Sequence, residues 1–293
     1  MDRPADSSQD SMTALLHDLL LKSAERNPGK TAVIHKQTKL NYADLAQLVV
    51  QLAHSFLSLG MQRQDRIAIY LPKRPEGVAA MFAATASGGA FVPVNPLLKG
   101  PQVVHILRDC NVRILITSVD RVSQLRDELS HCKDLRHIIV LDAETDAESS
   151  LGHINVLTWN SALGTADELV AGRIIDQDMA SIFYTSGSTG KPKGVVLSHR
   201  NMVAGAKSVA EYLGSSTDDR LLAVLPFSFD YGFSQLSTAF HSGASVTLMD
   251  YLFPKDVIRA VADGAITGLA GVPPLWIQIA KLEWPAEATA SLR

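Results

Sequence analysis

Residues 184–194 read Tyr-Thr-Ser-Gly-Ser-Thr-Gly-Lys-Pro-Lys-Gly, and the rest of the chain is best interpreted from this stretch. Its eleven residues combine three glycines, two lysines and four aliphatic hydroxyl groups. Glycine lets the backbone approach a ligand closely, and successive backbone N–H groups can form an anion-binding concavity. Hydroxyl and ammonium groups add hydrogen-bond donors and positive charge. This composition predicts a phosphate-binding loop.

The main alternative is a flexible Gly/Ser linker, but strand-like residues flank the stretch on both sides and a linker does not need Lys-Pro-Lys-Gly. Other loop types do not fit. A Walker loop has four residues between its glycines, whereas two separate Gly187 from Gly190, and Pro192 follows Lys191. A Gly-x-Ser-x-Gly elbow fails because Ser186 occupies the place of its first glycine, and Gly-x-Gly-x-x-Gly does not match.

Composition narrows the class of protein. With 293 residues, 46% of them hydrophobic, the chain can bury a large core. A net charge of −3 gives no reason to expect nucleic acid or an anionic membrane as a partner, and no apolar run is long enough for a membrane span. Cys110 and Cys132 form no Cys-x-x-Cys pair, so we expect inert packing residues in a reducing, cytoplasmic setting.

Short apolar segments alternate with amphipathic ones along the first half of the chain. This pattern predicts an α/β fold with mostly parallel sheets covered by helices. We expect a disordered leader at 1–11, a first α/β subdomain at 12–176, and a second at 177–293 that carries the phosphate loop and is incomplete at its C-terminus.

Residues 184–201 resemble the signature loop of the AMP-forming adenylate superfamily, which contains acyl-CoA synthetases, peptide-synthetase adenylation domains and firefly luciferase. Segments 40–45 and 87–96 also resemble motifs of this family, and we expect them to be structural. Residues 225–233 and 268–280 are most similar to the acyl-CoA ligases that accompany exosortase systems. The resemblance implies the front part of the large N-terminal domain of the adenylate-forming fold.

In that family, ATP activates a carboxylic acid as acyl-AMP with release of pyrophosphate, and a thiol of CoA or a carrier protein then takes the acyl group. The resemblance thus implies ATP, Mg²⁺ and CoA, with a small carboxylate, fatty or aryl rather than an amino acid, as substrate. Thr185 and Lys193 are the expected catalytic residues, and Thr185 is the expected magnesium contact. The expected nucleotide-binding residues are Thr185, Ser186, Gly187, Ser188, Thr189, Gly190, Lys191 and Lys193.

A second stretch, residues 226–233, resembles the family's acyl-pocket motif, so Phe229, Asp230 and Tyr231 are expected to contact substrate. Phe229-Asp230 is similar to the peptide-synthetase form, in which the aspartate holds an amino group, whereas Tyr231 and the glycine after it are similar to the acyl-CoA ligase form. Asp230 could equally cap the following helix. Gly271 is expected at the floor of the pocket, with an ordinary strand end as the alternative.

The nine histidines form no His-Glu-x-x-His motif, so no transition-metal site is expected. The family's later acidic residue, ribose-binding aspartate, hinge and small C-terminal lid domain with its lysine have no counterpart before Arg293. We therefore expect a fragment of an acid–thiol ligase that does not turn over by itself. Two alternatives remain: an amino-acid-activating adenylation domain and a non-catalytic nucleotide-binding module.

Overall fold

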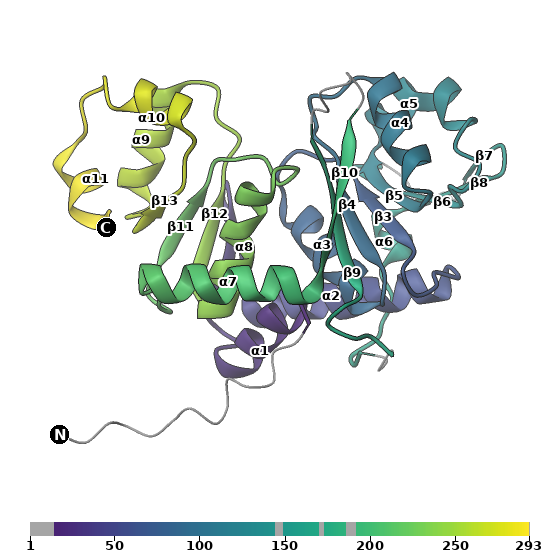
Figure 1. Cartoon of the computed structure of the whole chain (residues 1–293), viewed down its shortest axis with the longest axis horizontal. Helices are drawn as coiled ribbons and strands as arrows, with labels where there is room; N and C mark the ends of the chain where they lie inside the picture. The colour runs from purple at the N-terminus through teal and green to yellow at the C-terminus, as the bar shows by residue number, and fades with distance from the viewer. Residues whose placement is uncertain (1–14, 144–148, 170–172, 186–191, 293) are drawn as a thin grey trace.

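The computed structural model describes residues 15–143, 149–169, 173–185 and 192–292, and the leader expected at 1–11 lies outside them. Two sheets stand side by side in this part of the chain (Figure 1). The smaller sheet has the strand order β13-β11-β12-β1-β2. Its strands are β1 (Thr31–His35), β2 (Thr38–Asn41), β11 (Arg220–Ala223), β12 (Ser245–Leu248) and β13 (Gly268–Leu269).

The larger sheet has the order β10-β9-β4-β3-β5-β6-β8-β7. Its strands are β3 (Arg66–Ile69), β4 (Ala90–Pro93), β5 (Val112–Ser118), β6 (His137–Leu141), β7 (Ser149–Leu151), β8 (Ile154–Thr158), β9 (Met179–Thr185) and β10 (Lys193–Ser198). Across the described strands, only the edge strands β2, β7 and β10 pair in antiparallel fashion. The predicted fold class, mostly parallel sheets covered by helices, is confirmed.

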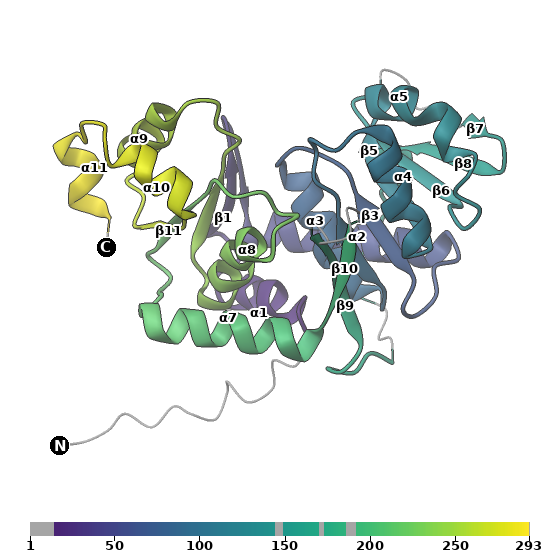
Figure 2. The same cartoon turned by 45° about the horizontal axis from the view of Figure 1, so that its top comes forward.

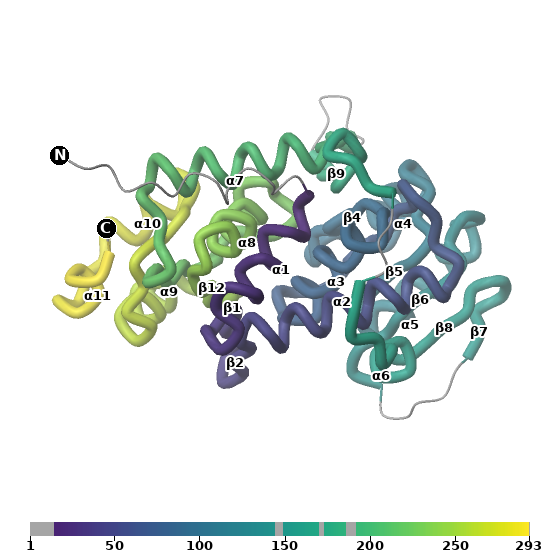
Figure 3. The backbone as a smooth tube through the Cα atoms, turned by 90° about the horizontal axis from the view of Figure 1, so that it is seen from below, coloured from purple at the N-terminus to yellow at the C-terminus, as the bar shows by residue number. Residues whose placement is uncertain are grey.

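Helices cover both faces of each sheet. The helices are α1 (Asp18–Arg26), α2 (Tyr42–Ser58), α3 (Pro75–Ala86), α4 (Gly100–Asp109), α5 (Val119–Leu129), α6 (Trp159–Ala162), α7 (His199–Leu213), α8 (Asp230–Ser242), α9 (Pro254–Asp263), α10 (Pro273–Ile279) and α11 (Ala286–Ser291). Figures 1 and 2 show α4 and α5 outside the larger sheet and α9 to α11 outside the smaller one. Helix α1 lies against both α2 and α8 (Figure 3).

The burial pattern explains these layers. Ile67 and Ile69 of β3 face the largest core, which α2, α3 and α8 fill between the two sheets, whereas Ala68 faces the core beneath α4 and α5. Side chains of a strand alternate between its two faces, so a strand that is apolar at every position must be covered on both. No helix in the described residues is both long and apolar enough to cross a membrane.

An aromatic cluster joins the two sheets at the centre of the molecule. The ring of Phe233, in the first turn of α8, lies 4.8 Å from that of Phe91 on β4 and 6.1 Å from that of Phe183 on β9, centroid to centroid. Phe82 of α3 stacks on Phe233 at 5.9 Å. Rings at such distances interlock, and they are fully or almost fully buried here. Strand β9 and the start of α8 are therefore held in one rigid core.

Each sheet combines strands from both sides of residue 176. Strands β9 and β10 belong to the larger sheet with β3 to β8, while β1 and β2 join the smaller sheet beside β12. Parallel pairing depends on which segments the crossover helices bring together, and residue order alone does not specify it.

Candidate functional site

The phosphate-loop stretch includes the last residues of β9 and the first residues of β10, which form an antiparallel hairpin. Lys193 pairs with Thr185, and Gly194 pairs with Tyr184, in antiparallel register. Directly paired residues have Cβ atoms about 5 Å apart and project to the same face. The Thr185 hydroxyl and the Lys193 ammonium group therefore lie on one face of this hairpin end, and both residues are exposed. The expected ligand residues Ser186, Gly187, Ser188, Thr189, Gly190 and Lys191 lie outside the described residues.

Gly194 is required by the packing of this hairpin. A Cβ atom at Gly194 would lie 2.7 Å from Ile182 Cγ2 and 3.2 Å from Tyr184 Cζ. The first contact would force a shift of the packing and the second is tight, so the glycine leaves room for the Tyr184 ring on the neighbouring strand. Close packing, and not backbone freedom, explains this glycine of the motif.

The end of β10 leads into α7 through an N-cap at Ser198. Ser198 Oγ accepts a hydrogen bond from the N–H of Asn201 at 3.2 Å. His199 is fully buried and its Nδ1 accepts a hydrogen bond from the N–H of Leu16 at 3.0 Å. Its ring also packs edge-on against His17, 5.9 Å away. His199 therefore has a packing role at the start of α7.

The second stretch forms a tight turn between β11 and α8. The N–H of Phe229 donates to the carbonyl oxygen of Pro226 at 3.1 Å, and the N–H of Phe233 donates to that of Phe229 at 3.0 Å. A Cβ atom at Gly232 would lie only 2.1 Å from the Pro226 oxygen. The first turn of α8 can therefore close over this carbonyl only with glycine at position 232.

The expected substrate residues project from this turn, which we call the acyl turn (residues 226–233). The rings of Phe229 and Tyr231 meet edge to face at 6.3 Å, and each side chain is 43% exposed. Asp230 is the first residue of α8 and is exposed, and its Oδ1 accepts the N–H of Tyr231 at 2.8 Å. A carboxylate in the first turn also interacts favourably with the helix dipole. Asp230 lies one residue after the N-cap position, so this hydrogen bond is made within the first turn of α8. The carboxylate remains exposed to solvent.

Lys73 is a site residue that sequence reasoning missed. Its side chain is 5% exposed, and Nζ donates to the Val224 oxygen at 3.0 Å, to the Met249 oxygen at 2.8 Å and to Asp250 Oδ1 at 2.9 Å. Burial lowers the pKa of Lys73, and the Asp250 carboxylate opposes that shift. Phe227 lies beneath the ammonium group, 5.9 Å from ring centroid to Nζ.

Lys73 therefore ties the carboxyl end of β3 to the ends of β11 and β12, just before the acyl turn. Ligands of open α/β sheets bind at this edge. The signal in the sequence was a lysine placed directly after a buried apolar strand, where a charge is costly unless it is paired.

Gly271 lies beside an aromatic side chain. The Trp276 indole Nε1 donates to the Gly271 oxygen at 3.1 Å, and a Cβ atom at Gly271 would lie 2.9 Å from Nε1. Trp276 itself is 40% exposed. The indole thus covers the face of Gly271 that a side chain would occupy, and any substrate reaching this backbone must contact Trp276.

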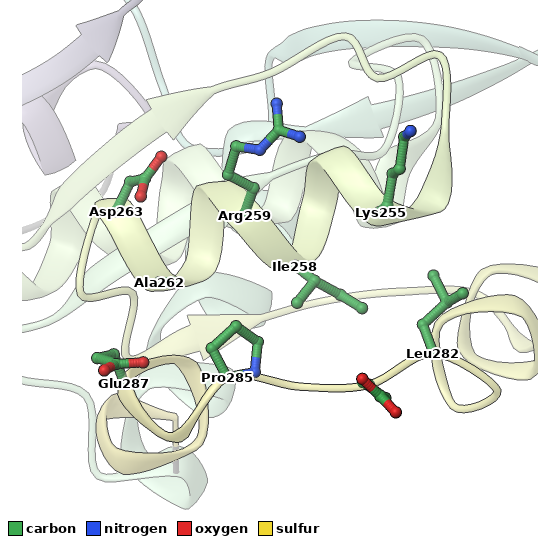
Figure 4. Close-up of a pocket in the computed structure, with 9 residues that line it drawn as sticks. Lys255, Ile258, Arg259, Ala262, Asp263, Leu282, Pro285 and Glu287 are labelled. Atoms are coloured by element: carbon green, nitrogen blue, oxygen red, sulfur yellow. The ribbon is translucent and has the colours of Figure 1, made fainter.

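A groove of about 580 Å³ runs between α9 and residues 282–287. Figure 4 shows Ile258 of α9 on the side that faces the segment with Pro285 and Leu282, and these three residues line the groove. None of the expected site residues lines this groove. The candidate site is therefore the region of the hairpin end and the acyl turn, and not this groove.

Comparison with known proteins gives relatives of two kinds. The chain is 29% identical over 276 residues to feruloyl-CoA synthase of Amycolatopsis sp, covering 93% of this chain and 52% of that protein. It is 29% identical over 266 residues to bacitracin synthase 3 of Bacillus licheniformis, covering 90% of this chain and 4% of that protein. The chain thus spans about half the length of the first relative and a small part of the second.

The fold is also similar to a solved structure of the anthranilate CoA ligase AuaEII in complex with anthranoyl-AMP. The TM-score is 0.83 at 22% identity, with 95% of this chain and 54% of that one covered. A family model described as AMP-binding enzyme matches residues 20–293. Nearly the whole chain fits this model, so the protein belongs to the AMP-binding enzyme family.

Proposed function

We propose that this chain is the acid- and nucleotide-binding part of an AMP-forming acid–thiol ligase of the acyl-CoA synthetase type. It activates a carboxylic acid, a fatty acid in the first instance, as acyl-AMP and transfers the acyl group to CoA. The observation that carries the proposal is the pairing of Thr185 with Lys193 at the hairpin end, in a chain of the AMP-binding family. The buried contact between Phe183 and Phe233 supports a common site for the hairpin and the acyl turn.

In the proposed first step, a carboxylate oxygen of the acid attacks the α-phosphorus of ATP. A new P–O bond forms, the bond to the β-phosphate oxygen breaks, and pyrophosphate leaves with the electron pair. The two reactants are anions that repel each other, so the protein must align them and neutralise charge. The exposed Lys193 ammonium group supplies positive charge, and the Thr185 hydroxyl supplies a polar contact on the same face.

Magnesium fits this arrangement because the ion keeps several waters and is held mainly by substrate phosphates and a few protein oxygens. Thr185 is the described residue that would contact it, since its hydroxyl oxygen is a hard ligand at the exposed end of β9. The ion would offset charge on the phosphates. In the second step, the CoA sulfur attacks the acyl carbonyl carbon and AMP leaves.

Asp230 favours a second candidate, the activation of an amino acid for a peptide synthetase. Its carboxylate is exposed, and its hydrogen bond to the N–H of Tyr231 uses only Oδ1. The side chain as a whole is exposed, so an ammonium group of a substrate could reach it. The similarity to bacitracin synthase 3 also supports this alternative. A third possibility is a nucleotide-binding module without catalysis.

ATP–pyrophosphate exchange distinguishes these functions. The assay is run with fatty, aryl and amino acids on this chain and on the longest available version of the gene product, together with direct measurement of MgATP binding. We expect exchange with fatty or aryl acids. Exchange with amino acids alone would assign the peptide-synthetase function. If both proteins bind MgATP and neither catalyses exchange, the non-catalytic nucleotide-binding module would be the remaining function.

A further inference from the structure

Helix α4 contacts both sides of the β9–β10 hairpin. Tyr184 Oη donates a hydrogen bond to Asp109 Oδ2 at 2.6 Å. One helical turn earlier, His105 Nε2 lies 3.4 Å from the Pro192 oxygen, a contact in which the tautomer with hydrogen on Nε2 donates. Residues four apart in a helix lie on the same face. One face of α4 therefore reaches the residue before Thr185 and the residue before Lys193.

These contacts are polar and lie near solvent. Asp109 lines a groove of about 650 Å³ along α4 and a second one of about 370 Å³ beside the hairpin. Tyr184 is only partly buried, in contrast with the closed aromatic core around Phe183. The hydrogen bond between Tyr184 and Asp109 can therefore be removed without opening a cavity in the core.

The geometry also makes the contact stiff. The Tyr184 ring lies close over Gly194, in the space that a side chain at this position would occupy, while its hydroxyl is held by Asp109. Partial burial raises the pKa of the Tyr184 phenol, and its hydrogen bond to the Asp109 carboxylate raises it further. The phenol stays protonated and donates at every physiological pH. A hydrogen bond to a charged acceptor is shorter and stronger than one between neutral groups.

We infer that Asp109 and His105 are positioning residues for nucleotide binding, with Asp109 the stronger of the two. They fix the two sides of the hairpin against α4, and so set where the Thr185 hydroxyl and the Lys193 ammonium group stand before ATP arrives. A pre-organised site loses less free energy on binding than one that must be ordered by its ligand. This inference rests on the proposed function, because it assigns these residues to the ATP site.

The test compares Tyr184→Phe and Asp109→Ala with the unmodified chain. We expect each variant to raise the Kd for MgATP about five- to tenfold; tenfold corresponds to about 1.4 kcal/mol. The double variant should bind no more weakly than either single one, because both remove the same hydrogen bond. Asp109→Asn, which keeps an oxygen acceptor, should restore most of the affinity.

The matched control is Tyr212→Phe, which removes the same hydroxyl from a tyrosine that is 73% exposed on α7. It should leave the Kd for MgATP unchanged. His105→Ala should raise the Kd by about two- to threefold, less than Asp109→Ala, because its contact is longer. Thermal unfolding of every variant identifies any loss of affinity that merely follows a loss of stability.

Hydrogen–deuterium exchange of the hairpin amides, measured without ATP, separates failure of this inference from failure of the proposed function. We expect Tyr184→Phe to speed exchange in β10 and not in β3. Unchanged MgATP affinity in Tyr184→Phe and Asp109→Ala would overturn the positioning role and leave the function standing. If the unmodified chain and the longer product bind no MgATP, the function fails. In that case hydrogen–deuterium exchange still tests whether the contact between Tyr184 and Asp109 fixes the hairpin. An unchanged exchange rate of the β10 amides in Tyr184→Phe would refute this.

Discussion

Replacing Lys73 by methionine tests the junction between the two sheets. The substitution keeps the length of the side chain but removes the ammonium group that donates to Val224, Met249 and Asp250. Methionine leaves two backbone carbonyls without their donor, and each buried unsatisfied group costs about 1–3 kcal/mol. The Asp250 side chain is 52% exposed, so water can replace its lost partner.

This loss of stability is partly offset, because the methionine variant does not bury a charge. The expected net destabilisation is about 2–4 kcal/mol, which for a chain of this size corresponds to a fall in Tm of roughly 3–7 °C. Urea unfolding followed by circular dichroism gives the free energy, and thermal unfolding gives the Tm. Lys133→Met, at an exposed lysine before β6, is the control and should change stability by less than about 0.5 kcal/mol.

The same variant reports on the acyl turn, since the Val224 oxygen lies just before it. We expect the affinity for the acid substrate to fall more than that for MgATP, because Lys73 contacts the ends of β11 and β12 and not the β9–β10 hairpin. Equal stability of Lys73→Met and Lys133→Met would refute the reasoning. It would mean that the three hydrogen bonds contribute no more than the buried charge costs.

Three further predictions follow from local geometry. Burial lowers the pKa values of His17 and His199 to about 4, so between about pH 6.5 and 4 the unfolded chain binds more protons than the folded one. The free energy of unfolding should therefore fall as the pH drops through this window, by up to about 3 kcal/mol per histidine. A Tm that is flat from about pH 7 to 4 would contradict this. Gly232→Ala should destabilise the chain by more than about 3 kcal/mol in urea unfolding, whereas Gly205→Ala, with open space around its Cβ position on α7, should be neutral or stabilising. Lys193→Ala in the longest available version of the gene product should slow ATP–pyrophosphate exchange by roughly 10- to 100-fold with an unchanged circular dichroism spectrum, and loss of folding would count against the assigned role.

Local chemistry in the sequence was enough to predict the fold class and the ends of several elements. The apolar run at 137–141 forms β6, and Ser198 is the N-cap of α7. Both depend on neighbours within a few residues: an apolar run long enough to cross a sheet, or a hydroxyl placed three residues before the amide that it caps. The signature stretch at 184–194 also identified the family without any tertiary information.

The tertiary structure decided which distant segments meet. No local pattern shows that β9 joins the larger sheet or that β1 joins the smaller one, because parallel partners are separated by crossover connections. The roles of Lys73 and Asp109 have the same origin. Each is an ordinary charged residue in the sequence, and its partners lie 75 or more positions away. Propensity and periodicity describe neighbours along the chain, whereas the role of a buried charge depends on the groups that folding brings within hydrogen-bonding distance.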